Sequence, residues 1–316
     1  MKKVIFISLL ILLSFYFLSC DNSFSPYAPF TEDYILNGII RGDTSYQVVT
    51  LTHSYQPDGS DPLAYKNDPA IVGARVEITY DNKIYVLRDS SITSIDTLHF
   101  DSLFRFYYTN DLGPDVNKTI SIKAVLPNGK VLTADTKTPN TGTSIYGYDF
   151  FEFTSDFDFP PPKGNRSFVY WKNLGNLYYA PEININYQVA GDSGLYKITV
   201  PVSYGKGGPK YAEPTRNTYL SFDSSAVRKT LNKLAGRYGS ESKLKIIYIT
   251  VDVLVYDEYL SLYFSSLQLG LDGFTVRIDN PDYSNIKGGY GIFGCYEKVT
   301  HLIRIKSAYL KSLGFQ

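Results

Sequence analysis

Ile120-Ser-Ile-Lys-Ala-Val-Leu-Pro-Asn-Gly-Lys-Val-Leu-Thr-Ala-Asp135 predicts two short strands joined by a tight turn. The runs Ile120–Leu126 and Val131–Asp135 are rich in strand-forming residues and flank Asn128-Gly129. Asn and Gly both tolerate positive φ, which the tightest hairpin turns require. This stretch therefore predicts a β-hairpin and points to a β-rich fold.

Strand patterns of the same kind continue on the N-terminal side of this hairpin. Ala74–Tyr80 alternates, so that Ala74, Val76, Ile78 and Tyr80 share one face. The other expected strands are Tyr34–Arg41, Tyr46–Ser54, Ile84–Leu87 and Phe104–Tyr108. About seven short strands in a hundred residues favour an immunoglobulin-like or transthyretin-like β-sandwich over residues 34–140.

The second part, residues 141–316, mixes strands with helices. The polar stretch Thr138–Ser144 contains Pro, Gly and Thr and marks the expected boundary between the two domains. We expect strands at Ser167–Trp171, Glu182–Val189, Tyr196–Val202, Leu244–Val255, Phe274–Ile278 and His301–Ile305, and helices at Ala226–Arg237, Tyr256–Leu269 and Ser307–Leu313. Ser224-Ser225 is the expected N-cap of the first helix and Gly239 its stop. The fold class is thus mainly β, with a β-rich α+β second domain.

The N-terminus has the features of an export signal. Met1-Lys2-Lys3 is positive, and Val4–Leu18 is an almost unbroken apolar run. Fifteen helical residues span about 22 Å, which is shorter than a transmembrane helix needs. Leu18-Ser19-Cys20 resembles the cleavage site of bacterial lipoproteins, so we expect residues 1–19 to be a signal peptide and Cys20 to be acylated. Residues 20–33 would then tether the protein to a membrane of the cell envelope; the alternative is an uncleaved anchor with an incidental cysteine.

Composition limits the classes of function. The chain has 316 residues with 31 basic and 31 acidic side chains, so no excess of charge favours nucleic acid. After Cys20 the only cysteine is Cys295, which rules out an internal disulfide in the mature chain and is expected to be a small buried apolar residue. The three histidines lack zinc-site spacing, and no Walker A or Rossmann glycine motif is present, so we expect no metal and no cofactor.

One sequence motif suggests catalysis. Gly191-Asp192-Ser193-Gly194 resembles the nucleophile motif of chymotrypsin-like proteases, and His53 and Asp111 precede it in the matching order. Leu195-Tyr196 follows instead of the Gly and Pro of that family, and the four residues also suit a turn. We therefore expect no enzyme activity, with a secreted hydrolase as one alternative.

Aromatic residues are unusually abundant, with 29 Tyr and 19 Phe. Flat aromatic rings suit glycan or peptide ligands, and the candidate rings lie where tyrosines crowd polar loops. They are Tyr146, Tyr148, Trp171, Tyr178 and Tyr179. The competing interpretation, which we favour, is that these rings pack the domains together.

A dense glycine cluster lies near the C-terminus. Its marked residues are Asn285, Gly288, Gly289, Gly291, Phe293 and Gly294. Strand-forming residues follow rather than a helix N-terminus, so a phosphate loop is not expected. We expect the glycines to permit close backbone approach, and Ile286, Tyr290, Ile292 and Phe293 to pack into the core.

Ser284-Asn285-Ile286-x-Gly288-Gly289-x-Gly291-x-Phe293-Gly294 also resembles the closing signature of a lipoprotein family of unknown function. That family occurs in Gram-negative bacteria that use TonB-dependent receptors for nutrient uptake. Val48–Leu51, Val72–Val76 and Val255–Leu260 resemble three further marks of the family, in the same order.

The resemblance implies an outer-membrane lipoprotein, often encoded beside a TonB-dependent receptor, and it implies no catalytic residues. The resulting hypothesis is a non-catalytic ligand-binding or accessory partner of such a transporter. A structural or adhesion lipoprotein is the other alternative.

Overall fold

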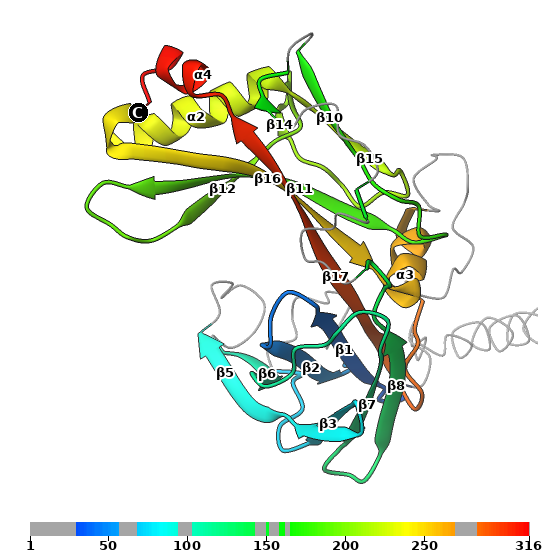
Figure 1. Cartoon of the computed structure of the whole chain (residues 1–316). Coiled ribbons are helices and arrows are strands. Elements are labelled where there is room, and N and C mark those ends of the chain that lie inside the picture. Colours follow the sequence, from blue (N-terminus) through cyan, green and yellow to red (C-terminus); the bar gives the residue numbers. More distant parts are fainter. Residues whose placement is uncertain are drawn as a thin grey trace, which may run out of the picture.

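The computed structural model describes residues 30–56, 68–93, 103–142, 150–151, 158–161, 165–268 and 283–315. The predicted signal peptide, Cys20, Tyr146, Tyr148 and the expected strand Phe274–Ile278 lie outside the described residues. The fold is mainly β, as predicted. Figure 1 shows two halves, one above the other, joined by the long strand β17 (Tyr290–Ile305), which runs from one into the other.

One large sheet forms the frame of both halves. Its strand order is β12-β11-β16-β17-β1-β2-β6-β5, with β9 paired to the end of β17. In that order the strands are Tyr196–Val200, Tyr179–Val189, Leu244–Tyr256, Tyr290–Ile305, Tyr34–Arg41, Gln47–His53, Leu103–Thr109 and Arg88–Thr93, and β9 is Asp158–Phe159. The first strand of the fold, β1, pairs in parallel with the last, β17.

The lower half is a two-layer β-sandwich. A second sheet, of order β4-β3-β7-β8, packs on one face of β1, β2 and β17. Its strands are Lys83–Val86, Arg75–Tyr80, Thr119–Val125 and Val131–Lys137. The hairpin predicted from Asn128-Gly129 joins β7 to β8, and Gly129 has φ 84° as that turn requires.

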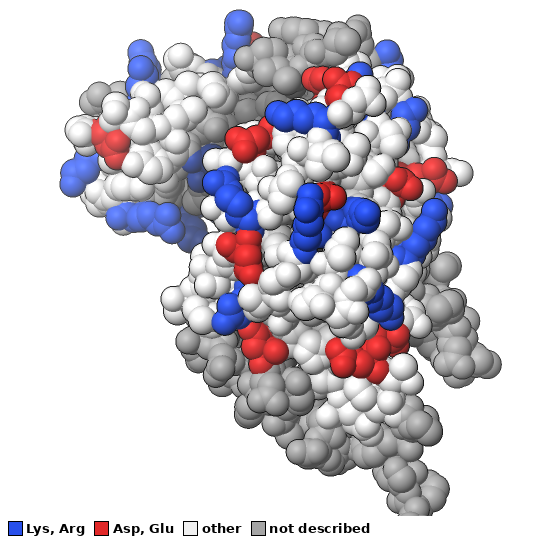
Figure 2. Space-filling view, turned by 90° about the horizontal axis from the view of Figure 1, so that it is seen from below, with Lys and Arg blue, Asp and Glu red and all other residues white. Residues whose placement is uncertain are grey.

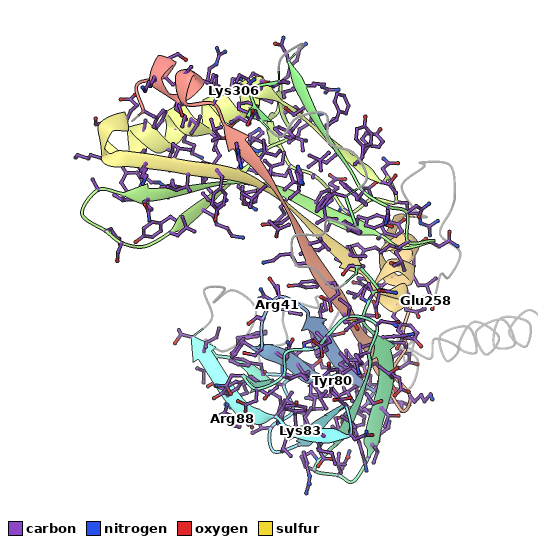
Figure 3. The ribbon with its side chains drawn as sticks, in the orientation of Figure 1. Arg41, Tyr80, Lys83, Arg88, Glu258 and Lys306 are labelled. Carbon is purple, nitrogen blue, oxygen red and sulfur yellow. The ribbon has the colours of Figure 1, made fainter. Side chains whose placement is uncertain are left out.

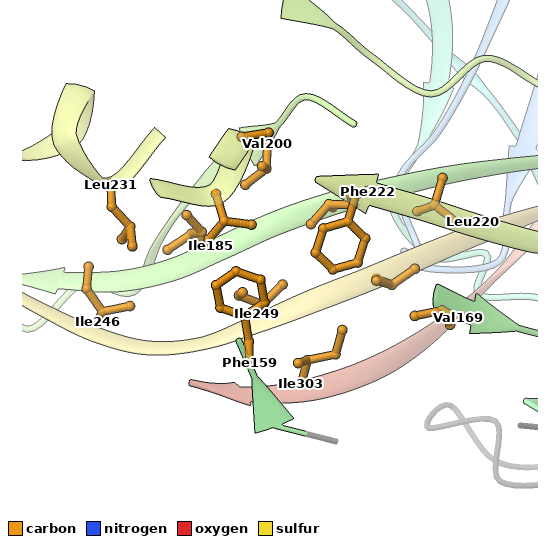
Figure 4. Packing of buried hydrophobic residues seen from close by; sticks show 14 of the residues in the cluster. Phe159, Val169, Ile185, Val200, Leu220, Phe222, Leu231, Ile246, Ile249 and Ile303 are labelled. Atoms are coloured by element: carbon orange, nitrogen blue, oxygen red, sulfur yellow. The ribbon is translucent and has the colours of Figure 1, made fainter. Parts of the chain in front are cut away.

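The upper half covers the same face of the large sheet with helices and a hairpin. The covering elements are α2 (Ser224–Tyr238), α4 (Ser307–Ser312), β10 (Arg166–Tyr170) and β15 (Tyr219–Asp223), with the short pieces β13 (Ser203–Gly205), β14 (Gly208–Lys210) and η2 (Glu241–Lys243). Phe159 and Phe222 stack at the centre of this core (Figure 4). Each fully buried ring contributes about 2–3 kcal/mol through burial.

Helix α2 is amphipathic, as its spacing predicts. Val227, Leu231 and Leu234 are buried, and Gly239 ends the helix in the left-handed conformation with φ 78°. The predicted serine N-cap is wrong: the cap residue is Asp223, whose side chain makes no capping hydrogen bond.

Strand β17 belongs to both halves. Phe293 and Cys295 lie in the core of the sandwich, whereas Val299 and Ile303 lie in the core of the upper half. Helix α3 (Glu258–Gln268) packs beside β17 where β16 ends. The segment predicted as a separate domain after residue 140 therefore supplies a strand to the sandwich before it.

Two local expectations differ from the structure. Tyr290 is 55% exposed rather than packed in the core, and it is the first residue of β17. The strand β5 was not expected, since its residues are polar and mostly exposed at the edge of the sheet.

Candidate functional site

Within the described residues, one face of the large sheet is covered by other elements and the opposite face is not. Along every strand, the residues that alternate with the two cores point to the uncovered side. Because the sheet twists strongly between its ends, the uncovered surfaces of the two halves turn toward each other (Figure 1). We call this surface the inner face.

Four aromatic rings form a continuous row on the inner face of the sandwich. Phe104, Phe106 and Tyr108 alternate along β6, and Tyr46 lies just before β2. The ring centroids of successive neighbours are 6.0, 6.0 and 5.6 Å apart. Phe104 and Tyr46, at the two ends, are 48% and 41% exposed, whereas Phe106 is 7% exposed. We call these four rings the aromatic ladder.

A basic side chain extends the ladder. The Arg88 guanidinium lies over the Tyr108 ring at 4.8 Å, and its Nη2 donates to Asn110 Oδ1 at 2.6 Å. Arg88 and Tyr108 are cross-strand partners, so they share the inner face. The ladder therefore combines flat apolar surface with a positive charge.

A chain of hydrogen bonds crosses the inner face of the upper half. Thr199 Oγ1 donates to Asn184 Oδ1 at 3.0 Å, and Asn184 Nδ2 donates to Asp252 Oδ2 at 3.1 Å. Thr300 Oγ1 donates to the other oxygen of Asp252 at 2.8 Å. We call these four residues the polar row; they come from β12, β11, β16 and β17.

The polar row distinguishes the inner face from a core layer. Asn184 is fully buried and Asp252 is 7% exposed, and burial of such groups is tolerated only because each is hydrogen-bonded. A face built to pack against another apolar layer would carry aliphatic residues here, as the opposite face does. The inner face instead carries a hydrogen-bonded polar layer, of which Thr199 is the exposed end.

A charged cluster lies between the ladder and the polar row. The Asp43 carboxylate accepts from Arg41 at 3.1 Å and lies 3.1 Å from Lys298 Nζ. Burial disfavours the charged form, but hydrogen bonds from Arg41 and Lys298 outweigh it and lower the pKa of Asp43 to about 2. Figure 3 shows Arg41 on the side of the lower half that faces the upper half.

Two buried carboxyl groups elsewhere have raised pKa values. Burial raises the pKa of Asp257 to about 6, although Thr136 Oγ1 and the backbone N–H of Leu260 donate to it. Asp257 lines a cavity of about 180 Å³, but both of its oxygens are occupied in holding α3 and β8. We therefore assign it a capping role.

Glu297 is the second of these groups. Burial, followed by repulsion from Asp115 and Asp43, raises the pKa of Glu297 to about 7. The carboxyl group is sealed beneath Gly42, where a Cβ atom would overlap it. Cys295, two residues earlier, is fully buried, and burial raises the pKa of its thiol well above the usual value.

The protease-like motif forms a turn between β11 and β12. Asp192 Oδ1 accepts from the backbone N–H of Gly194 at 2.7 Å, which closes an Asx-type turn. His53 lies at the end of β2, with its Nδ1 2.9 Å from the Ser54 carbonyl oxygen. The described contacts do not assemble a triad, and no group of three metal-ligating side chains occurs within the described ranges.

The aromatic residues chosen from the sequence do not form a ligand platform among the described residues. Trp171, Tyr178 and Tyr179 are 1%, 4% and 0% exposed. Trp171 and Tyr179 pack against each other at 5.7 Å in the upper core, and the Arg216 guanidinium lies 5.0 Å from the Tyr178 ring. Trp171 directly follows β10 and Tyr179 begins β11, which places both rings in the core. The alternation Phe104-x-Phe106-x-Tyr108 was the sequence signal for the aromatic ladder on the opposite face.

The glycine-rich segment positions β17 against its neighbours. Asn285 Nδ2 donates to the Phe293 carbonyl oxygen at 2.7 Å, and Phe293 N–H donates back to Asn285 Oδ1 at 2.9 Å. Gly291 has φ 113°, and a Cβ atom there would overlap the Leu36 carbonyl oxygen. Added Cβ atoms would likewise strike backbone or side-chain atoms at the other signature glycines, Gly288, Gly289 and Gly294. Of the core residues expected here, Ile286, Ile292 and Phe293 are buried.

Residues 23–301 match the family model described as a domain of unknown function, DUF4249. The chain belongs to this family. The match spans both halves, including β1, β16 and most of β17, so the shared sheet is part of the DUF4249 unit. Membership in a family of unknown function is thereby confirmed, whereas the lipid anchor and the family-wide closing signature stay predictions. No curated protein matches the chain.

Within the part of the chain that the structure describes, no helix is long and apolar enough to cross a membrane.

Proposed function

We propose that this DUF4249 protein is a non-catalytic lipoprotein, anchored through Cys20 to the outer membrane, that binds a ligand on its inner face. We further propose that it acts as an accessory partner of a TonB-dependent nutrient transporter. The observation that carries the proposal is the inner face itself, where half-exposed rings and a hydrogen-bonded polar row lie on one uncovered surface.

The chemistry of the inner face supports binding rather than reaction. Binding sites combine apolar and aromatic surface with a few fixed polar groups. Both oxygens of Asp252 accept hydrogen bonds within the polar row, so its carboxylate is held in place. The two carboxyl groups with raised pKa values, Asp257 and Glu297, are occupied or sealed away from this surface.

The test is recovery of the protein with its partners from native membranes. A tag after Gln316 would allow extraction in mild detergent and identification of co-purifying proteins by mass spectrometry. We expect a TonB-dependent receptor in near-stoichiometric amount. Recovery of the lipoprotein alone, from extracts in which known membrane complexes survive, would contradict the accessory role and favour an independent adhesion protein.

Cys20→Ala provides the matched control for anchoring. The variant lacks the sulfur that would carry lipid, so we expect it to leave the outer-membrane fraction. If Cys20→Ala stays in that fraction as firmly as the unaltered protein, the anchoring proposal is wrong.

A further inference from the structure

The inner face carries an excess of positive charge in a chain that is neutral overall. Among the described residues, its basic side chains are Arg41, Arg88, Lys197, Lys245, Lys298 and Arg304, and its acidic side chains are Asp43, Asp158, Glu182 and Asp252. The balance is six against four, whereas the whole chain has 31 of each. Seen from below, basic and acidic side chains are interspersed over the visible surface, with several basic side chains on the lobe at the upper left (Figure 2).

Two of these basic residues are placed to meet a ligand. Lys197 and Lys245 are exposed, and their cross-strand partners are Asn186 and Gln188 of β11. Across the described ranges neither lysine is in an ion pair. The Asp43 cluster adds another positive charge, because one carboxylate is shared by Arg41 and Lys298.

We propose that the inner face binds an extended acidic oligosaccharide that runs across the large sheet, with sugar rings against the aromatic ladder on β6 and acid groups near Lys197 on β12 and Lys245 on β16. The inference rests on the proposed function, whose ligand it specifies. The half-exposed rings of Tyr46 and Phe104 offer flat surface to the C–H faces of sugars. Thr199 is exposed, and its hydroxyl, which donates to Asn184 Oδ1, can accept a hydrogen bond from a sugar hydroxyl.

The position of this surface in the sheet argues against an extended peptide. Peptides that bind β-proteins commonly add a strand at an open edge, where backbone groups are unpaired. Three of the four residues of the polar row lie on β11, β16 and β17, which are hydrogen-bonded to strands on both sides, whereas Thr199 lies on the edge strand β12. Side chains must therefore supply the hydrogen bonds on this surface, and a ligand rich in hydroxyl and acid groups matches them.

The experiment measures binding of the full chain, purified in detergent, to oligogalacturonate by biolayer interferometry. The fully methyl-esterified oligomer has the same rings without the charges and serves as the neutral comparison. We expect saturable binding of the acidic oligomer that weakens as salt rises, because exposed charge pairs are screened. Binding of the neutral oligomer should be much weaker.

Matched variants locate the site. Replacing Lys197 and Lys245 together with glutamine should weaken binding roughly tenfold, since two exposed ion pairs are lost. The control pair, Lys123→Gln with Lys233→Gln, removes the same charge from exposed positions on β7 and α2 and should leave affinity unchanged.

Tyr46→Ala tests the ladder against Tyr219→Ala. The two tyrosines are similarly exposed, at 41% and 45%, and each contacts one tyrosine ring, at 5.6 and 5.9 Å. Only Tyr46 lies on the inner face, so only its loss should weaken binding, by roughly fivefold to tenfold.

Several outcomes would overturn the assignment. These are absence of binding to oligogalacturonate and to a sulfated oligosaccharide, equal losses in inner-face and control variants, and equally tight binding of polyglutamate or of phosphatidylglycerol vesicles. Receptor recovery without oligosaccharide binding would refute the ligand class and leave the transporter role standing. Oligosaccharide binding without receptor recovery would refute the transporter role and leave the ligand class standing.

Discussion

Replacing Glu297 with glutamine should change how the stability of the protein depends on pH. The Glu297 side chain is 6% exposed, and its Oε1 accepts no hydrogen bond from the described residues. Burial, with repulsion from Asp115 and Asp43, raises its pKa from 4.5 to about 7. The folded protein therefore holds this proton more tightly than the unfolded chain does.

The difference in pKa between the folded and unfolded chain determines how the free energy of unfolding changes with pH. Because the pKa is raised on folding, the stabilising contribution is fully present below about pH 4.5 and is lost as pH rises through about 7. The pKa values differ by about 7 − 4.5 = 2.5 units, which corresponds to a loss of about 3 kcal/mol at most. Glu297→Gln cannot ionise, so it should lack this loss.

Urea unfolding of both proteins at pH 4.5 and pH 8 measures the effect. Between these pH values the unaltered protein should lose about 3 kcal/mol relative to Glu297→Gln. Any fixed cost of burying the new amide is the same at both pH values and cancels, as does the titration of Asp43 and Asp257. Identical pH dependence in the two proteins would refute the reasoning.

Further substitutions test the contacts that hold the two halves. Asp257→Ala should cost about 1–2 kcal/mol in urea unfolding, because it removes the cap of α3, whereas Asp257→Asn should retain most of that stability. Gly291→Ala should cost at least about 2 kcal/mol, since φ 113° is strained for alanine and the new Cβ meets the Leu36 carbonyl oxygen; an unchanged melting temperature would contradict this. Gly236→Ala should instead raise stability by about 0.5–1 kcal/mol, because Gly236 lies inside α2 with open space around it, and a loss would show that the space is not free.

Local patterns in the sequence predict most of the individual elements. The strand expected at Tyr34–Arg41 has those bounds in the structure, and α2 ends at the predicted glycine. Such elements are specified by residues close together, through alternation, turn chemistry and caps. Strand β5 was missed because an exposed edge strand has no buried face and hence no alternation to detect.

Pairing between segments that are distant in the sequence could not be predicted from local patterns. Ile292 N–H donates to Asn37 Oδ1 across 255 residues, and nothing near either residue specifies the other. The polar row could not be predicted for the same reason, because Asn184, Asp252 and Thr300 come from three strands whose order in the sheet the sequence does not give. The aromatic ladder could have been predicted from Phe104, Phe106 and Tyr108, which are spaced by two along one strand. The density of tyrosines in loops, from which the candidate rings were selected, identified buried residues instead.

The glycine-rich segment is a local sequence feature that determines how distant strands pack. Gly288 and Gly291 allow β17 to approach the carbonyl oxygens of Val131 and Leu36, one on each sheet of the sandwich. The same strand then enters the upper half and carries Thr300 to the polar row. The close approach at the glycines therefore fixes where β17 leaves the sandwich, and with it the position of the polar row relative to the aromatic ladder. A substitution such as Gly291→Ala should consequently weaken ligand binding on the inner face even though Gly291 is remote from both groups of side chains.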